Sequence, residues 1–411
     1  MSTLCVQKYD GSRLGYSIPV VAEKWHASGL AWTVLPRLNA AAIEIMADPR
    51  RLTFLRRRTT GRGMDTMAAN VALIGIGMGA SAHVTAVAAS ENLVLHGVLS
   101  RNQQRAKAFC EAYAERHDAP APIAYAGLEA LVADEAIDFV IVCTPPDARA
   151  DIINALCEAK KPILMEKPVE RTLEQATTIV ERCEKAGVPL GIVLQHRMRD
   201  ASMQLADLIE SGGFGPIGVV EINVSWWRPQ DYYDEPGRGT YARDGGGVLI
   251  SQAIHPLDLA LSLCGPVTRV QAMARTSNLH QMEAEDFVSA GLDFANGACG
   301  SLVASTASFP GMPESLVIHC ENASVRLQSG QIEVHWRNGD HELLGETSTS
   351  GGGADPMDFP HAWHQRIIED FADALATGRD PAVTGRKALE VHRLIEALIR
   401  SSKEQQAVSL S

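Results

Sequence analysis

The chain has 411 residues, of which 46% are hydrophobic and 21% charged, and this length predicts two or three domains rather than a single core. Acidic residues outnumber Lys and Arg by 49 to 37, which argues against a nucleic-acid-binding protein, and no apolar run is long enough for a membrane protein. The eight cysteines are scattered without a CxxC pair or zinc-ligand spacing, so we expect reduced thiols in a cytoplasmic protein and no bound metal.

The beginning of the chain differs in charge from the rest. Residues 1–66 carry ten Lys or Arg and five acidic residues, whereas the remainder carries 27 Lys or Arg and 44 acidic residues. A secretory signal would place an apolar run after its basic residues, and an organelle transit peptide would hold fewer acids. We favour a third interpretation, in which residues 1–67 are a poorly ordered leader without chemistry and Met64 or Met67 is the natural start.

A glycine-rich turn follows the first apolar segment. Residues 71–77 (VALIGIG) are typical of a buried parallel strand, and residues 81–90 have helical composition. Glycines between them permit a tight turn, and the free N–H groups at the helix start suit a pyrophosphate. A turn without a ligand is the alternative. The residues predicted to contact a dinucleotide here are Gly75, Gly77, Met78 and Ala80.

The second predicted strand, residues 93–100, ends at Ser100 and is followed by Arg101 and a helix over 101–117. In dinucleotide folds an acid at this place accepts hydrogen bonds from the ribose 2′-hydroxyl, whereas an arginine suits a 2′-phosphate. We therefore favour NADP over NAD as the cofactor. The alternative is that Arg101 is only a solvated residue of the first helical turn.

Strands and helices continue to alternate up to residue 194, which predicts a doubly wound parallel sheet. Ligands of such sheets bind beyond the carboxyl ends of the strands. The predicted strands 138–146 and 162–166 end in Thr144, Pro145, Glu166 and Lys167, which we expect near the cofactor. Lys167 is also a candidate acid or electrophile, although a lone lysine is more often a solvated surface charge.

The second half of the chain is rich in strands. Residues 219–226 and 286–294 alternate between apolar and polar side chains, and short strands continue between residues 300 and 336. Strands in succession without helices indicate antiparallel pairing. We expect an α+β domain over 195–345, followed at 346–411 by a loop and two C-terminal helices.

One helix of this half carries candidate catalytic residues. Residues 247–263 are predicted to form a helix that begins at a Gly245–Gly247 turn. Ser251, His255 and Asp258 lie near one face of it, since they are spaced by four and three residues. Pro256 lacks an N–H group, so we expect a kink or a shifted helix start. A packed core histidine is the alternative role for His255.

Four motifs together resemble the Gfo/Idh/MocA oxidoreductases from about residue 68 to the C-terminus: GIGMGA (75–80), CTPP (143–146), MEKPVERTLEQA (165–176) and RDGGGVLISQAIHPLDLAL (243–261). The resemblance implies a Rossmann domain over residues 68–194 and a second domain with an open, mainly antiparallel sheet. It also implies NAD(P)-dependent chemistry on sugars, cyclitols and related small hydroxy or keto compounds, in homodimers or homotetramers. On this pattern Lys167 is the active-site lysine and His255 the general acid/base.

One position departs from the pattern. Many members carry Asp four residues before the histidine, where this chain has Ser251. A hydroxyl offers no charge to stabilise an imidazolium, so proton donation to a carbonyl by His255 or Lys167 fits at least as well as alcohol oxidation. Asp258 is an alternative source of the missing carboxylate.

The function hypothesis is hydride transfer between NADP(H) or NAD(H) and a small hydroxy or keto compound. His255 exchanges the proton on the substrate oxygen, and Lys167 stabilises its negative charge. An NAD-retaining glycoside hydrolase and a non-catalytic NADP-binding sensor are the alternatives. The further candidates for substrate contact are Arg197, Trp227, Tyr241, Arg243, Ser251 and Asp258.

Overall fold

The computed structural model describes residues 68–348 and 360–410. The leader predicted over residues 1–67 lies outside the described residues, as does most of the loop predicted over 345–359. Within the described ranges, no helix is both long enough and apolar enough to cross a lipid bilayer.

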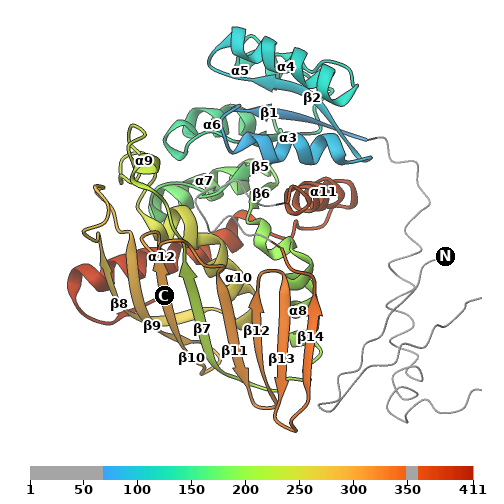
Figure 1. The fold of residues 1–411 in the computed structure, drawn as a ribbon. Coiled ribbons are helices and arrows are strands. Elements are labelled where there is room, and N and C mark those ends of the chain that lie inside the picture. The colour runs from blue at the N-terminus through green and yellow to red at the C-terminus, as the bar shows by residue number, and fades with distance from the viewer. Residues whose placement is uncertain (1–67, 349–359, 411) are drawn as a thin grey trace, which may run out of the picture. The chain divides into compact units, whose positions relative to one another are not determined.

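The first sheet has six strands, all parallel, with helices on both sides of it (Figure 1). Val71–Ile74 in the first strand and all of the fourth strand are buried, as expected of a parallel sheet covered on both faces. The predicted doubly wound sheet is therefore confirmed. In sheet order the strands are β3 (Ile123–Ala124), β2 (Leu93–Leu99), β1 (Ala69–Ile74), β4 (Phe139–Val142), β5 (Ile163–Glu166) and β6 (Leu190–Val193).

The helices between these strands follow the predicted alternation, with one short helix, α5, that the sequence analysis did not include. They are α3 (Ala80–Ala89), α4 (Gln103–His117), α5 (Leu128–Val132), α6 (Ala150–Glu158) and α7 (Leu173–Ala186), with a 3₁₀ turn η1 (Pro146–Ala148). Asn102 and Thr172 cap α4 and α7 by accepting backbone N–H groups of the first turn.

The second sheet has nine strands among the described residues, and every neighbouring pair is antiparallel except β7 and β10. Strands β8, β9 and β10 follow one another in the chain and pair antiparallel. Strand β10 then lies beside β7 and runs in the same direction, so that pair is parallel. In sheet order the strands are β14 (His341–Gly345), β13 (Gln331–Trp336), β12 (Ala323–Gln328), β11 (Ser315–Cys320), β7 (Ile217–Ser225), β10 (Cys299–Ser305), β9 (Phe287–Phe294), β8 (Val267–Arg275) and β15 (Val408–Ser409).

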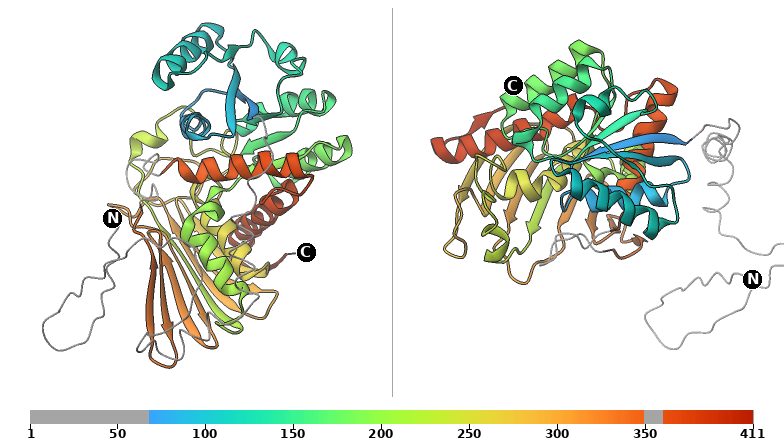
Figure 2. Two further views of the ribbon diagram at one scale, coloured as in Figure 1. Left: turned by 90° about the vertical axis from the view of Figure 1, so that its right-hand side faces the viewer. Right: turned by 90° about the horizontal axis from the view of Figure 1, so that it is seen from above.

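Helices pack on one face of this second sheet (Figure 2). In β9 the residues Val288, Ala290, Leu292 and Phe294 are buried, which is the alternation that the sequence predicted. The helices on that side are α8 (Asp200–Glu210), α10 (Ile254–Cys264) and α12 (Gly385–Glu404).

The C-terminal segment connects the two sheets. Helix α11 (Ala362–Thr377) packs against α3, and its Phe371 ring lies 5.3 Å from the ring of Phe139 in β4. Helix α12 packs against both α7 and β8, and β15, which was not predicted, pairs with β8. The segment predicted as a loop and two helices therefore also completes the second sheet.

The predicted helix over 247–263 begins irregularly. A π-helical turn, η3 (Leu249–Ala253), precedes α10, so regular α-helical structure starts only at Ile254. Pro256 cannot donate to Gln252, which is the irregularity expected from the sequence. Turns of this kind occur frequently at functional sites.

Candidate active site

A cavity of about 450 Å³ lies between the two sheets. One wall is formed by the glycine-rich turn and the carboxyl ends of β4 and β5, and the other by some of the side chains between Trp226 and His255 and by the start of α11. The cavity thus occupies the position predicted from the topology of the parallel sheet, with the second domain closing it.

The glycine-rich turn has the shape that a dinucleotide needs. Gly75 has a φ of +95°, and a Cβ there would lie 3.1 Å from the carbonyl of Cys143, so a side chain is excluded. A Cβ at Gly77 or Gly79 would meet nothing within 4 Å, which leaves open space above the turn. Gly77, Met78 and Gly79 line the cavity, whereas Gly75 and Ala80 shape the turn from behind.

Polar atoms at the edge of this turn lack partners. The Thr144 hydroxyl is buried without a hydrogen bond, and both Thr144 and Pro145 line the cavity. Because buried polar groups are normally satisfied, the open turn, the start of α3 and this hydroxyl fit the phosphate and ribose of a dinucleotide. Ser100 and Arg101 do not line the cavity, and Arg101 is exposed at the tip of β2.

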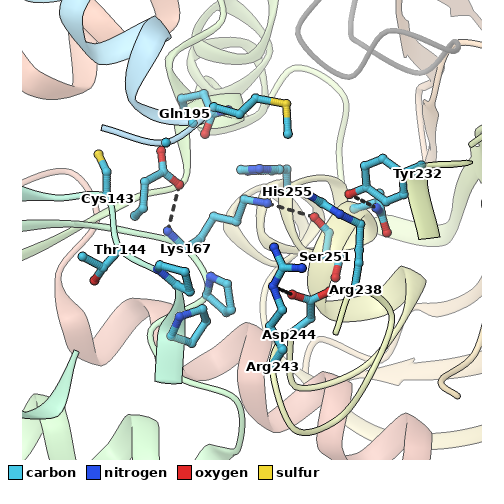
Figure 3. A pocket seen from close by; sticks show the side chains of 18 of the residues that line it. Cys143, Thr144, Lys167, Gln195, Tyr232, Arg238, Arg243, Asp244, Ser251 and His255 are labelled. Atoms are coloured by element: carbon cyan, nitrogen blue, oxygen red, sulfur yellow. Dashed lines mark hydrogen bonds and ion pairs between the residues drawn. The ribbon is translucent and has the colours of Figure 1, made fainter. Parts of the chain in front are cut away.

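Lys167 follows β5 and extends across the cavity (Figure 3). Its Nζ donates a hydrogen bond of 2.8 Å to the carbonyl oxygen of Ser251, in the π-helical turn that precedes His255. Burial lowers the pKa of Lys167, while the Glu166 carboxylate opposes that shift. The structure therefore brings the predicted lysine of the first domain to the predicted histidine helix of the second.

Glu166 forms a buried ion pair that the sequence analysis did not include. Its Oε1 lies 2.7 Å from Nε2 of His83 in α3 and 3.8 Å from Nε2 of His364 in α11. Burial opposes ionisation of both partners, but Cys143 and Glu166 raise the pKa of His83 to about 10, and His83 lowers the pKa of Glu166 to about 2. These three side chains also lie close enough together to hold a metal ion, although an imidazolium already neutralises the carboxylate.

His255 has different neighbours. Its ring stacks on that of His196, with centroids 4.7 Å apart and an interplanar angle of 21°. Burial, followed by the positive charges of Lys167 and Arg199, lowers the pKa of His255 well below its usual value. The imidazole is therefore neutral at pH 7, and its buried Nδ1 has no hydrogen-bond partner.

Asp258 does not supply the missing carboxylate. Its two oxygens accept hydrogen bonds of 2.7 and 2.6 Å from Arg197, and neither residue lines the cavity. A bidentate pair of this kind satisfies both side chains. The prediction that Arg197 and Asp258 contact substrate is corrected here, because the two residues bind each other.

Trp227 and Tyr241 also lie outside the cavity lining. Successive residues of an extended segment point to opposite sides, so Trp226 faces the cavity while Trp227 packs against the rings of Phe309 and His280. The Tyr241 side chain is 38% exposed and lies beneath Lys403. Of the predicted substrate contacts, Arg243 and Ser251 line the cavity.

A charged network forms the wall opposite Lys167. Glu235 accepts hydrogen bonds from both Arg238 and Arg243, which lower its pKa, and Arg238 also lies 4.2 Å over the Tyr232 ring. The lining residues that were not predicted as site residues are Gly79, Cys143, Pro146, Arg149, Pro168, Gln195, His196, Trp226, Arg228, Tyr232, Glu235, Arg238, Asp244, Gln252, Trp363 and His364.

Gln195 and His196 could have been found from the sequence. They stand in the turn η2 (Gln195–Met198) directly after the buried strand β6, whose carboxyl end faces the same edge as β4 and β5. Arg197, the next residue, was predicted to contact substrate instead, but it pairs with Asp258 and does not line the cavity.

Comparison with known proteins identifies both halves of the chain. Residues 69–193 match the family model of an oxidoreductase family with an NAD-binding Rossmann fold, and residues 202–326 match the GFO/IDH/MocA C-terminal domain. D-xylose 1-dehydrogenase (NADP(+)) 2 of Haloferax volcanii is 26% identical over 81% of this chain and 97% of the relative. Inositol 2-dehydrogenase of Rhizobium meliloti is 24% identical over 84% of this chain and 100% of the relative.

A similar solved structure is the WlbA dehydrogenase of Bordetella pertussis in complex with NADH and UDP-GlcNAcA. It is 26% identical, with a TM-score of 0.70 over 85% of this chain and 99% of that protein. The matches cover both sheets and the cavity between them. The chain belongs to the Gfo/Idh/MocA family of NAD(P)-dependent oxidoreductases.

Proposed function

We propose that this protein is a dehydrogenase or reductase that transfers a hydride between NAD(P) and a ring carbon bearing a hydroxyl or keto group, in a sugar or a cyclitol. The observation that carries the proposal is that Lys167, after strand β5 of the first domain, and His255, in helix α10 of the second, reach one cavity, which also extends to the glycine-rich turn. The relatives that act on D-xylose and on inositol support a polyhydroxylated ring as the substrate.

The two residues have distinct roles. The bound nicotinamide ring supplies the hydride acceptor or donor. Lys167 donates a hydrogen bond to the substrate oxygen and stabilises negative charge on it. His255 is neutral at pH 7, so its imidazole accepts the proton of a substrate hydroxyl and returns it in the reverse direction. The low pKa of His255 keeps the imidazole in the form that can accept a proton, although it also makes the ring a weaker base.

The test is a panel of sugars, cyclitols and aromatic dihydrodiols with NADP and with NAD, followed by the absorbance of the reduced nicotinamide. A substrate-dependent increase supports the dehydrogenase. Release of an alcohol from a glycoside without a net absorbance change would instead support the NAD-retaining glycoside hydrolase. Binding of cofactor without turnover of any compound in the panel would contradict the proposal and favour the sensor.

We further propose that NADP is preferred over NAD. Arg101 is exposed at the tip of β2 next to Ser100, and no acidic residue stands there to repel a 2′-phosphate. Arg101→Ala is expected to weaken NADPH binding by roughly tenfold and leave NADH binding unchanged, as measured by nicotinamide fluorescence. An equal effect on both cofactors would contradict the preference.

The oligomeric state and the cellular compartment of the protein are also proposed. Val219, Met273 and Leu343 are exposed on strands of the second sheet, and we propose that this sheet forms the interface of a homodimer or homotetramer in the cytoplasm. Light scattering on the purified protein measures the subunit number, and a monomer at micromolar concentration would contradict the proposal.

A further inference from the structure

His255 lacks the partner that a catalytic histidine normally has. A carboxylate or carbonyl that accepts a hydrogen bond from one ring nitrogen usually sets the orientation of the imidazole. Here, the residue one turn earlier is Ser251, whose carbonyl is bonded to Lys167, and Nδ1 of His255 has no partner. Some other contact must therefore fix the ring.

The stacked ring of His196 is that contact, and it is itself held firmly. His196 stands in η2, is 3% exposed, and its Nε2 accepts a short hydrogen bond from Nη2 of Arg199. Arg199 pairs through Nη1 with Glu314 Oε1 at 2.5 Å, and Glu314 Oε2 accepts a hydrogen bond of 3.2 Å from the indole of Trp226. The chain of contacts runs from the second sheet to the face of the His255 ring.

His196 and Glu314 are buried and Arg199 is largely covered, which restrains the geometry of the chain of contacts. The side chains of Arg199 and Glu314 are 12% and 9% exposed. Arg199 also lies 4.3 Å over the Trp363 ring, which restrains the guanidinium from a second side. A buried ion pair contributes little net stability, but its fixed geometry can specify one orientation of its neighbours.

We propose that His196 is a positioning residue for His255: held through Nε2 by the Arg199–Glu314 pair, its ring fixes the plane of the His255 imidazole by stacking and replaces an orienting carboxylate. The proposal deepens the proposed function, since it rests on the role of His255 as the proton acceptor. It assigns a reason for three polar side chains, His196, Arg199 and Glu314, which are bonded to one another.

The same arrangement sets the electrostatics around His255. The charged and titratable groups that face it are Lys167 from the end of β5, His196 from η2, Arg199 directly after η2, and His364 from α11. Lys167, Arg199 and His364 each lower the pKa of His255 further below the value that burial produces, and His196 is itself kept neutral by burial and by Arg199. A neutral ring can stack on the imidazole without adding a full positive charge.

The experiment compares three variants with the wild type under saturating cofactor and substrate. His196→Ala removes the stacked ring and is expected to lower kcat roughly 10–100-fold, with the KM for cofactor unchanged. His196→Phe keeps a stacking ring but loses the Nε2 acceptor that Arg199 holds, so it is expected to recover only part of that loss. His335→Ala, at a side chain that is 59% exposed, is the matched control and is expected to match the wild type.

A second measurement does not depend on turnover. In the protein without cofactor, the ¹³Cε1 resonance of His255, assigned by its loss in His255→Asn, is expected to titrate well below the usual range of a histidine. In the double variant Arg199→Met/Glu314→Gln, the midpoint is expected to rise but to stay below that range, since burial and Lys167 still lower the pKa of His255.

The outcomes separate the two proposals. If His255→Asn retains wild-type turnover, the role of His255 in the proposed function fails. If His255→Asn is inactive while His196→Ala matches the wild type, the positioning role of His196 is overturned and the function stands. If His196→Ala does not fold, His196→Phe decides, and a wild-type kcat in the double variant Arg199→Met/Glu314→Gln would overturn the inference.

Discussion

Buried histidines on the two sides of the cavity have pKa values shifted in opposite directions. Behind the wall formed by the parallel sheet, His83 is fully buried beside Cys143 and the Glu166 carboxylate, which raise its pKa to about 10. On the other wall, His255 is equally buried beside Lys167 and Arg199, and its pKa is lowered well below its usual value. Burial disfavours the imidazolium in both places, so the direction of the net shift depends on the sum of the charges beside each ring.

Lys167 stands between the two walls, and its removal is expected to have the largest effect. Lys167→Ala deletes the donor to the substrate oxygen, so kcat/KM is expected to fall by roughly 10²–10⁴-fold. Cofactor binding, measured by nicotinamide fluorescence, is expected to remain within about threefold, since the glycine-rich turn is untouched. Turnover equal to that of the wild type would remove Lys167 from the mechanism.

Loss of the ion pair between Glu166 and His83 is expected to have the next largest effect. Glu166→Gln leaves His83 buried without its counter-ion, and loss of one partner of a buried pair costs roughly 3–5 kcal/mol of unfolding free energy. The double variant His83→Gln/Glu166→Gln removes both charges and is expected to recover part of that loss. Urea unfolding of the single and double variants measures the coupling, and additive effects would contradict the ion pair.

Acidification distinguishes the two kinds of histidine. His255 and His196 have lowered pKa values, as do His364 (about 3) and His392 (about 4), so below pH 6.5 the unfolded chain binds protons that the folded protein does not. For each pH unit of acidification below pH 6.5, each such group lowers the free energy of unfolding by about 1.4 kcal/mol. His83 behaves oppositely, and its contribution is complete below pH 6.5 and is lost as the pH rises through about 10.

Urea unfolding at pH 5 and at pH 7.5 tests this expectation, with the higher stability predicted at pH 7.5. His392→Gln is the control, because Gln can still accept the hydrogen bond from the N–H of Val169 but does not titrate. It is expected to reduce the slope by about 1.4 kcal/mol per pH unit between pH 5 and pH 6. An unchanged slope would contradict the lowered pKa of His392.

The smallest predicted effect comes from adding a carboxylate next to His255. Ser251→Asp places an acid one turn before His255, and an opposite charge at that distance raises a histidine pKa by about one unit or more. The acidic limb of the kcat/KM profile is therefore expected to move to higher pH. A profile identical to that of the wild type would show that the new carboxylate does not reach the ring.

Much of the fold follows from local patterns. The buried strands β1, β4 and β5 are short apolar runs that end in glycine, proline or lysine, and the Gly-rich turn between β1 and α3 requires small residues. Lys167 and His255 were found because one follows a parallel strand and the other a glycine turn. Strand β8, with its many exposed residues, and the two-residue β15 have no such pattern, so they were missed.

The sequence by itself determined the class of this protein, because strand periodicity, the glycine turn and the four family motifs are properties of neighbouring residues. Only the tertiary structure decided which polar residues share the cavity. His196 stacks on a ring 59 positions later, and Asp258, spaced like a catalytic partner of His255, binds Arg197 instead. Charge and stacking act through space, so protonation and orientation depend on contacts that no local pattern encodes.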